Sequence, residues 1–108
     1  MSVRNAPLFD PAQLDRRAMG DESLRTELLA LFATEVERLM RQAEDAPDAV
    51  TRDDRLRAIS ASAGGVGAVR LAQTAKLLEA QFTVPEIDLD PLRDVVVETL
   101  AYLRQTGA

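Results

Sequence analysis

Apolar residues recur every three or four positions along most of the chain, a spacing that predicts amphipathic helices. The longest stripe lies between Asp21 and about Ala46, and it is wide enough to pack against two neighbouring helices. Its members are Leu24, Leu28, Leu29, Leu31, Phe32, Val36, Leu39, Met40 and Ala43. Several charged residues lie off this stripe, which is typical of a solvated helix face; they are Glu35, Glu37, Arg38, Arg41, Glu44 and Asp45.

Capping residues mark the expected helix starts. Asp10 followed by Pro11 predicts the start of a short first helix, and Gln13 stands where it would complete a capping box. Gly20 is expected to end this helix in a left-handed conformation, for which glycine has no steric penalty. Asp21 is then expected to cap the long second helix.

A third helix is expected to begin at Thr51 as its cap, with Asp54 at the third helical position. Its inward stripe consists of Leu56, Ile59 and Ala63. A glycine-rich bend should end this helix and reverse the chain, and it is made by Gly64, Gly65 and Gly67.

The last two helices are separated by a short break. The fourth is expected from about Gly67 to Phe82, and residues 83–85, Thr-Val-Pro, should interrupt the helical pattern. Asp90 and Pro91 repeat the cap-and-proline pattern and predict the start of a fifth helix. The core-facing residues of both are Leu71, Ala75, Leu78, Phe82, Leu92, Val96, Leu100 and Leu103, with Tyr102 at the rim. Three consecutive valines, at 95–97, lie within this helical frame and have no second strand candidate to pair with.

The 108 residues are enough for a single domain with one modest core. Hydrophobic residues make up 46% and aromatic residues only 4%, so aliphatic side chains must do the packing, which favours helices. The predicted fold is all-α. It consists of an antiparallel four-helix bundle with a short additional N-terminal helix, and residues 1–7 form a flexible arm.

Composition excludes several kinds of function. A formal charge of −5 argues against nucleic acid as a partner, since both would be negative. The chain holds neither cysteine nor histidine, so disulfides, thiolate chemistry, histidine triads and the usual zinc sites are excluded.

Asp53 and Asp54 diverge by about 100° on a helix and cannot act as a catalytic pair. We therefore expect no enzyme, no cofactor and no metal. No stretch is apolar enough for a signal peptide or a membrane span, which predicts a cytoplasmic location without membrane association.

Residues 56–79 read LRAISASAGGVGAVRLAQTAKLLE. This stretch matches, without a gap, the spacing of the pattern H-x-L-K-G-S-A, G-A, x-x-L and L-E. The first leucine of the pattern falls on Ile59 and the S-A pair on Ser62 and Ala63. The G-A pair falls on Gly67 and Ala68, the next leucine on Leu71, and the L-E pair on Leu78 and Glu79. This stretch resembles the signature of histidine phosphotransfer (HPt) domains, the four-helix modules that pass phosphoryl groups between receiver domains in bacterial phosphorelays. The resemblance covers the chain from Leu8 to about Leu103.

The positions that carry the family's chemistry are different here. The phosphorylatable histidine falls on Arg57, the lysine on Ser60 and the glycine on Ala61. Arginine stays protonated and has no neutral nitrogen with which to attack phosphorus. The resemblance therefore implies a pseudo-HPt, a non-catalytic module that docks on a receiver domain or a histidine kinase of a two-component phosphorelay. Its expected partner-binding residues are Asp53, Arg57, Ser60, Ala61 and Gly64.

Two alternatives remain open. Arg57 is a plain surface residue if it only pairs with Asp53 or Asp54 within its own helix. The chain is a self-association or scaffold domain unrelated to phosphorelays if Leu31 and Leu39, at the margin of the wide stripe, form a homodimer contact. A monomer is favoured over a homodimer.

Overall fold

The computed structural model describes residues 6–79, 81 and 86–105, and over these residues it is all-helical. Its helices are α1 (Pro11–Ala18), α2 (Glu22–Glu44), α3 (Ala49–Val66), α4 (Val69–Glu79) and α5 (Asp90–Gln105). No described residue lies in a strand, and the three valines at 95–97 are helical, as predicted. The expected all-α class is therefore confirmed.

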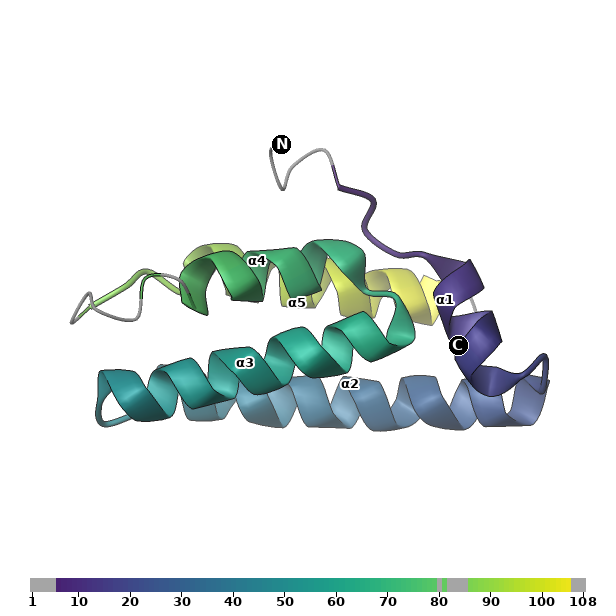
Figure 1. Ribbon diagram of the computed structural model, residues 1–108, viewed down its shortest axis with the longest axis horizontal. Coiled ribbons are helices and arrows are strands. Elements are labelled where there is room, and N and C mark those ends of the chain that lie inside the picture. The colour runs from purple at the N-terminus through teal and green to yellow at the C-terminus, as the bar shows by residue number, and fades with distance from the viewer. Residues whose placement is uncertain (1–5, 80, 82–85, 106–108) are drawn as a thin grey trace.

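The helices contact one another in a closed order. The long helices α2 and α3 lie side by side, α3 packs on α4, α4 on α5, and α5 returns to α2 (Figure 1). The short α1 lies across one end, where it contacts both α2 and α3. This order leaves the outer faces of α3 and α4 next to each other on the surface.

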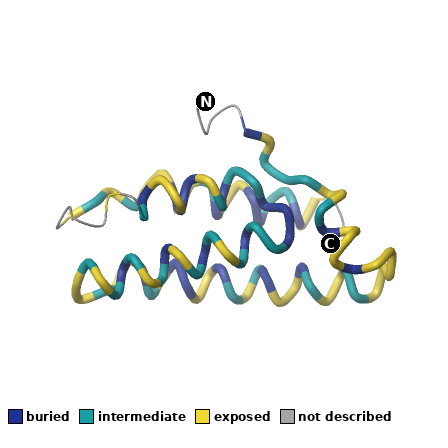
Figure 2. Tube along the Cα trace, in the orientation of Figure 1, coloured by how far each residue is buried: buried dark blue, intermediate teal, exposed yellow. Residues whose placement is uncertain are grey.

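The core is made by the stripes that the sequence predicts. Buried positions alternate with exposed ones along each helix in Figure 2, and the buried ones face the neighbouring helices. Fully buried side chains come from all five helices, and they include Leu14, Val36, Leu56, Ile59, Leu71 and Leu92. Each aliphatic side chain of this size stabilises the fold by about 1.5–3 kcal/mol when it leaves water.

The stripe of α2 is narrower than expected. Leu39 is buried, with 4% of its surface exposed, whereas Leu31 is 68% exposed. Successive helical residues are about 100° apart, so Leu31 points away from the face on which Leu29 and Val36 are buried. Of the two leucines expected at the margin of the stripe, only Leu31 lies on the surface.

Two of the predicted caps are confirmed. The Asp10 carboxylate accepts a hydrogen bond from the Ala12 N–H at 3.1 Å, and the Asp21 carboxylate accepts one from the Leu24 N–H at 3.1 Å. The capping box at Gln13 was wrong. The Asp10 N–H that it would satisfy donates instead to the Gly67 carbonyl at 2.7 Å, and the Gln13 side chain donates to the carbonyl of Gly64.

Two helix ends differ by a residue or two from the prediction. Helix α1 ends with Met19 in the left-handed region at φ 53°, directly before Gly20, which also has positive φ. Helix α5 begins at Asp90, and the Asp90 N–H donates to the Asp88 carboxylate at 2.9 Å. Thus Asp90 is the first helical residue and is not the cap.

The third helix starts earlier and ends later than predicted. Its cap is Asp48, whose carboxylate accepts from the Thr51 N–H at 2.7 Å, so Thr51 is a donor at the cap and not the cap itself. At the other end the helix continues through Gly64 and Gly65 to Val66. Of the three glycines of the predicted bend, only Gly67 has positive φ, at 86°, and it alone reverses the chain. Glycine lowers helix propensity without forbidding the helix, which explains the difference.

The remaining expectations lie partly outside the described residues. Helix α4 runs from Val69 to Glu79, while Phe82 and the break at 83–85 fall in the part that is not described. Of the predicted arm at 1–7, Ala6 is buried, and its carbonyl accepts two hydrogen bonds from the Arg70 guanidinium. Within the described residues, the helices are too short or too polar to cross a membrane.

Candidate functional site

Arg57 lies in the middle of α3 with 64% of its side chain exposed. Its guanidinium is held by two carboxylates from two different helices. Nη2 donates to Asp53 Oδ2 at 3.0 Å, one turn earlier on α3, and Nε donates to Glu79 Oε1 at 2.9 Å, at the end of α4. We call these three residues the Arg57 clamp.

The clamp combines an exposed cation with shielded anions. Only 13% of the Asp53 side chain and 21% of the Glu79 side chain are exposed, so the carboxylates sit lower on the surface than the guanidinium. The pKa of Arg57 is raised above its usual value, chiefly by the hydrogen bond to Glu79 and then by the charges of Asp53 and Glu79. The guanidinium therefore stays charged and oriented.

One edge of the guanidinium remains available. Nε and Nη2 are used by the clamp, whereas Nη1 makes no hydrogen bond to any described residue. Nη1 carries two N–H donors in a fixed plane, which suits an incoming carboxylate or phosphoryl oxygen. The chemistry that this arrangement supports is oxyanion binding.

The other expected site residues surround Arg57 in different ways. Ala61, one turn along α3, is exposed, and a Cβ added to Gly64 would meet nothing within 4 Å, so this face is low and open. Ser60 turns to the neighbouring helix, where its hydroxyl donates to the Ala72 carbonyl at 3.1 Å. Asp53 is already engaged by Arg57. The structure thus brings Arg57, Ala61 and Gly64 onto one open face, while Ser60 ties α3 to α4.

Sequence reasoning assigned no role to Glu79. Glu79 is the final glutamate of the motif at residues 56–79, and its approach to Arg57 depends on how α4 packs on α3. The available signal was its place directly after the core residue Leu78, which puts it at the border of the buried face.

A groove lies on another side of α3, where α1, α2 and α3 meet. It has a volume of about 340 Å³, and it is lined by Arg17, Leu28, Leu31, Phe32, Glu35, Ser62 and Val66. The Arg17 guanidinium rests directly on Gly65, where an added Cβ would meet it at 2.3 Å. The exposed Leu31 belongs to this groove.

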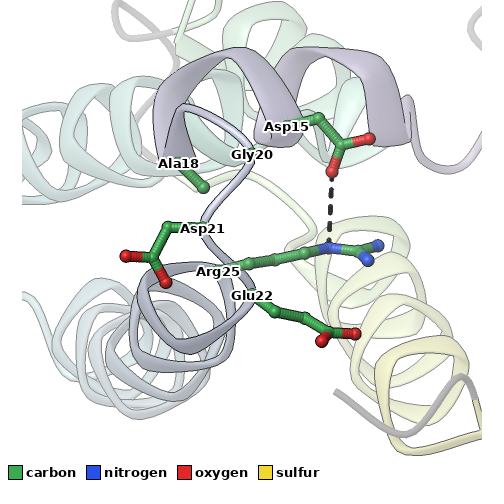
Figure 3. A pocket seen from close by; sticks show the side chains of 6 residues that line it. All are labelled: Asp15, Ala18, Gly20, Asp21, Glu22 and Arg25. Atoms are coloured by element: carbon green, nitrogen blue, oxygen red, sulfur yellow. Dashed lines mark ion pairs between the residues drawn. The ribbon is translucent and has the colours of Figure 1, made fainter.

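A second depression, of about 340 Å³, lies at the turn from α1 to α2 (Figure 3). Two of its three acidic side chains are already used. Asp15 faces Arg25 at 3.6 Å, and Asp21 turns away to cap α2. Among the described residues, no group of three or more acidic side chains could hold a metal ion. This depression is explained by the turn itself.

In comparisons with known proteins, no family model, no curated protein and no solved structure matches this chain.

Proposed function

We propose that this protein is a pseudo-HPt module that binds a receiver domain or a histidine kinase of a two-component phosphorelay without accepting a phosphoryl group. In this proposal α2 to α5 form the antiparallel four-helix bundle of the HPt kind, and α1 closes one end. The observation that supports it is the Arg57 clamp. It holds a permanent cation exposed in mid-helix, where the resemblance places the family's nucleophile.

The clamp suits docking on an acidic pocket. In the HPt family the histidine points into a receiver pocket that contains aspartates and a divalent ion. Arg57 would present the free Nη1 edge to one of those carboxylates, or to a phosphoaspartate. Because Asp53 and Glu79 already fix the guanidinium plane, less side-chain freedom is lost on binding.

The same carboxylates limit the strength of the attraction. Two carboxylates around one guanidinium leave the clamp with a net charge of −1 in its immediate surroundings. Long-range steering toward an acidic partner is therefore weak, and binding depends on short-range geometry over the open face of Ala61 and Gly64. We expect moderate affinity and a contact of less than ~1,200 Å², as in transient signalling complexes.

Affinity capture tests the proposal. The full chain, the Arg57→Glu variant and the Arg104→Glu variant serve as baits in a lysate of the source cells, and captured proteins are identified by mass spectrometry. Arg104 is exposed near the end of α5, so its variant changes the charge equally away from the clamp. Receivers or kinases held by the full chain and by Arg104→Glu, but lost from Arg57→Glu, support the proposal. Capture of no phosphorelay component by any bait contradicts it.

A second candidate function is self-association as a homodimer or scaffold module unrelated to phosphorelays. The exposed Leu31 in its groove favours self-association, whereas Leu39 is buried and cannot contribute to a contact between two copies. Sedimentation at increasing concentration distinguishes the two functions. A mass that rises with concentration, and falls back to that of a monomer in Leu31→Glu, supports the dimer.

A further inference from the structure

The end of the molecule where α2 turns into α3 carries a cluster of arginines. They line an open depression of about 450 Å³, a size within the range of small-molecule sites. The lining comes from the last turns of α2, the connecting turn and the first turns of α3, and it comprises Arg38, Arg41, Gln42, Asp45, Ala46, Pro47, Thr51 and Arg55.

Hydrogen-bond donors dominate this lining. Arg38, Arg41 and Arg55 contribute three guanidinium groups, and the Gln42 amide can also donate. Asp45 contributes the only carboxylate among the lining residues. The lining residues alone carry a net charge of +2, three arginines against one aspartate, while Glu35 and Asp54 pair with two of these arginines from outside the lining. Such a surface fits a ligand rich in acceptor oxygens.

The three arginines are available to a ligand. Arg41 forms no ion pair with any described residue. Arg38 pairs with Glu35 at 3.0 Å, with both side chains about half exposed. Exposed pairs of this kind contribute about 0–1 kcal/mol, so a ligand anion can replace such a partner.

Arg55 is incompletely satisfied as it stands. One end of its guanidinium contacts Asp54, whereas its Nε is buried without a hydrogen-bond partner. A buried donor without a partner is uncommon and unfavourable. A ligand that draws the Arg55 side chain into the depression would allow a better arrangement of its donors.

We propose that this depression binds a small molecule that carries two or more phosphate groups. Each guanidinium group can donate two parallel hydrogen bonds to the oxygens of a phosphate group. Three such groups, on two helices, have more donors than the two oxygens of a single carboxylate can accept, so a ligand with several phosphate oxygens fits them better. The start of α3 brings the positive end of its helix dipole to the depression, and the end of α2 brings the negative end of its own, so the attraction comes from the arginines.

This site is separate from the Arg57 clamp. Residues two apart on a helix point in nearly opposite directions, so Arg55 faces the α2 side of α3 while Arg57 faces α4. Docking through Arg57 would leave the depression open. The inference therefore goes beyond the proposed function and can stand or fail without it.

An NMR titration of the ¹⁵N-labelled full chain with sodium pyrophosphate, at constant ionic strength, tests the site. We expect saturable shifts of the Arg38, Arg41 and Arg55 resonances, including their Nε–H signals. Arg41→Gln/Arg55→Gln should weaken binding at least tenfold. The control Arg16→Gln/Arg104→Gln removes two exposed arginines from other helices and should bind as the wild type does.

The outcomes separate clearly. Saturable binding that only the Arg41/Arg55 double variant weakens establishes the depression as the site. Shifts that grow linearly, that sodium sulfate or chloride reproduces equally, or that both double variants reduce alike overturn it, because they indicate attraction of ions to arginines in general.

Discussion

Arg57 Nε donates to Glu79 Oε1 at 2.9 Å, and this bond joins the middle of α3 to the last residue of α4 across 22 positions of sequence. The surface that we propose for docking is therefore built by two helices. Arg57 does not move freely over it, because its guanidinium plane is fixed by a partner on each side.

Removal of Glu79 should release the Arg57 guanidinium. In Glu79→Ala, the Arg57 Nε–H loses its acceptor, and its hydrogen exchange, followed by NMR, should become several-fold faster. Asp54→Ala is the matched control, since Asp54 contacts Arg55 and its loss leaves both acceptors of Arg57 in place. Equal exchange rates in the wild type and Glu79→Ala would show that the contact is not maintained in solution.

Gly67 should be the least replaceable glycine of the described chain. Its φ is 86°, and an added Cβ would lie 2.3 Å from the Asp10 carbonyl oxygen, which is backbone and cannot move aside. Gly67→Ala is expected to lower the free energy of unfolding by about 2 kcal/mol or more. Urea denaturation measures the change.

Gly64→Ala provides the opposite case on the same helix. Gly64 is helical, and its missing Cβ points into open space. Alanine there should stabilise the protein by about 0.5–1 kcal/mol, because it reduces the freedom of the unfolded chain. If both glycine variants changed stability in the same direction, the difference between the two backbone positions would be refuted.

The two leucines at the margin of the α2 stripe should behave differently. Leu39→Ala leaves a cavity in the core and is expected to cost about 2–5 kcal/mol of stability. Leu31→Ala changes an exposed side chain and should stay within about 0.5 kcal/mol. A large loss from Leu31→Ala in a monomeric protein would contradict its exposed position.

Acid should weaken the cap of α3. Hydrogen bonds from the Thr51 N–H and hydroxyl lower the pKa of Asp48 below its usual value of 3.8. A folded-state pKa below that of the unfolded chain means that the stabilisation is complete above pH 3.8 and is lost as the pH falls through the folded value. Asp48→Asn keeps a capping oxygen that does not titrate.

The thermal midpoints of the wild type and Asp48→Asn, followed by circular dichroism, measure this effect. Their difference should be constant near neutral pH and should shift against the wild type as the pH falls below 3.8. A difference that stays the same down to about pH 2.5 would show that the Asp48 carboxylate does not stabilise the helix start.

Periodicity was sufficient to predict the helical class and most of the core. Stripes such as Leu56, Ile59 and Ala63 are buried because a helix that repeats apolar residues at this spacing has one face that must leave water. Helix ends were harder to predict, since neighbouring residues compete for the same backbone donors. Asp48 and Thr51 both could cap α3, and the hydrogen bond between them decides that Asp48 accepts.

The candidate site was only half predictable from sequence. The contact of Arg57 with Asp53 follows from their four-residue spacing on one helix. The contacts of α3 with Glu79 and with the Ala72 carbonyl do not follow from sequence spacing, because both groups lie on α4 and reach α3 only through the packing of the two helices. For the same reason, the Gln13 side chain bonds to Gly64 on α3 and does not complete a local capping box.

The most direct test of the docking proposal is calorimetric titration of a purified receiver domain from the same source into the full chain, Arg57→Glu and Arg104→Glu. The proposal predicts moderate affinity for the full chain and for Arg104→Glu, and at least a tenfold loss for Arg57→Glu, with no phosphoryl group transferred from a phosphorylated receiver. Equal affinity of all three proteins for the receiver would remove Arg57 from the interface, and no binding by any of them to the available receivers and kinases would contradict the proposed function.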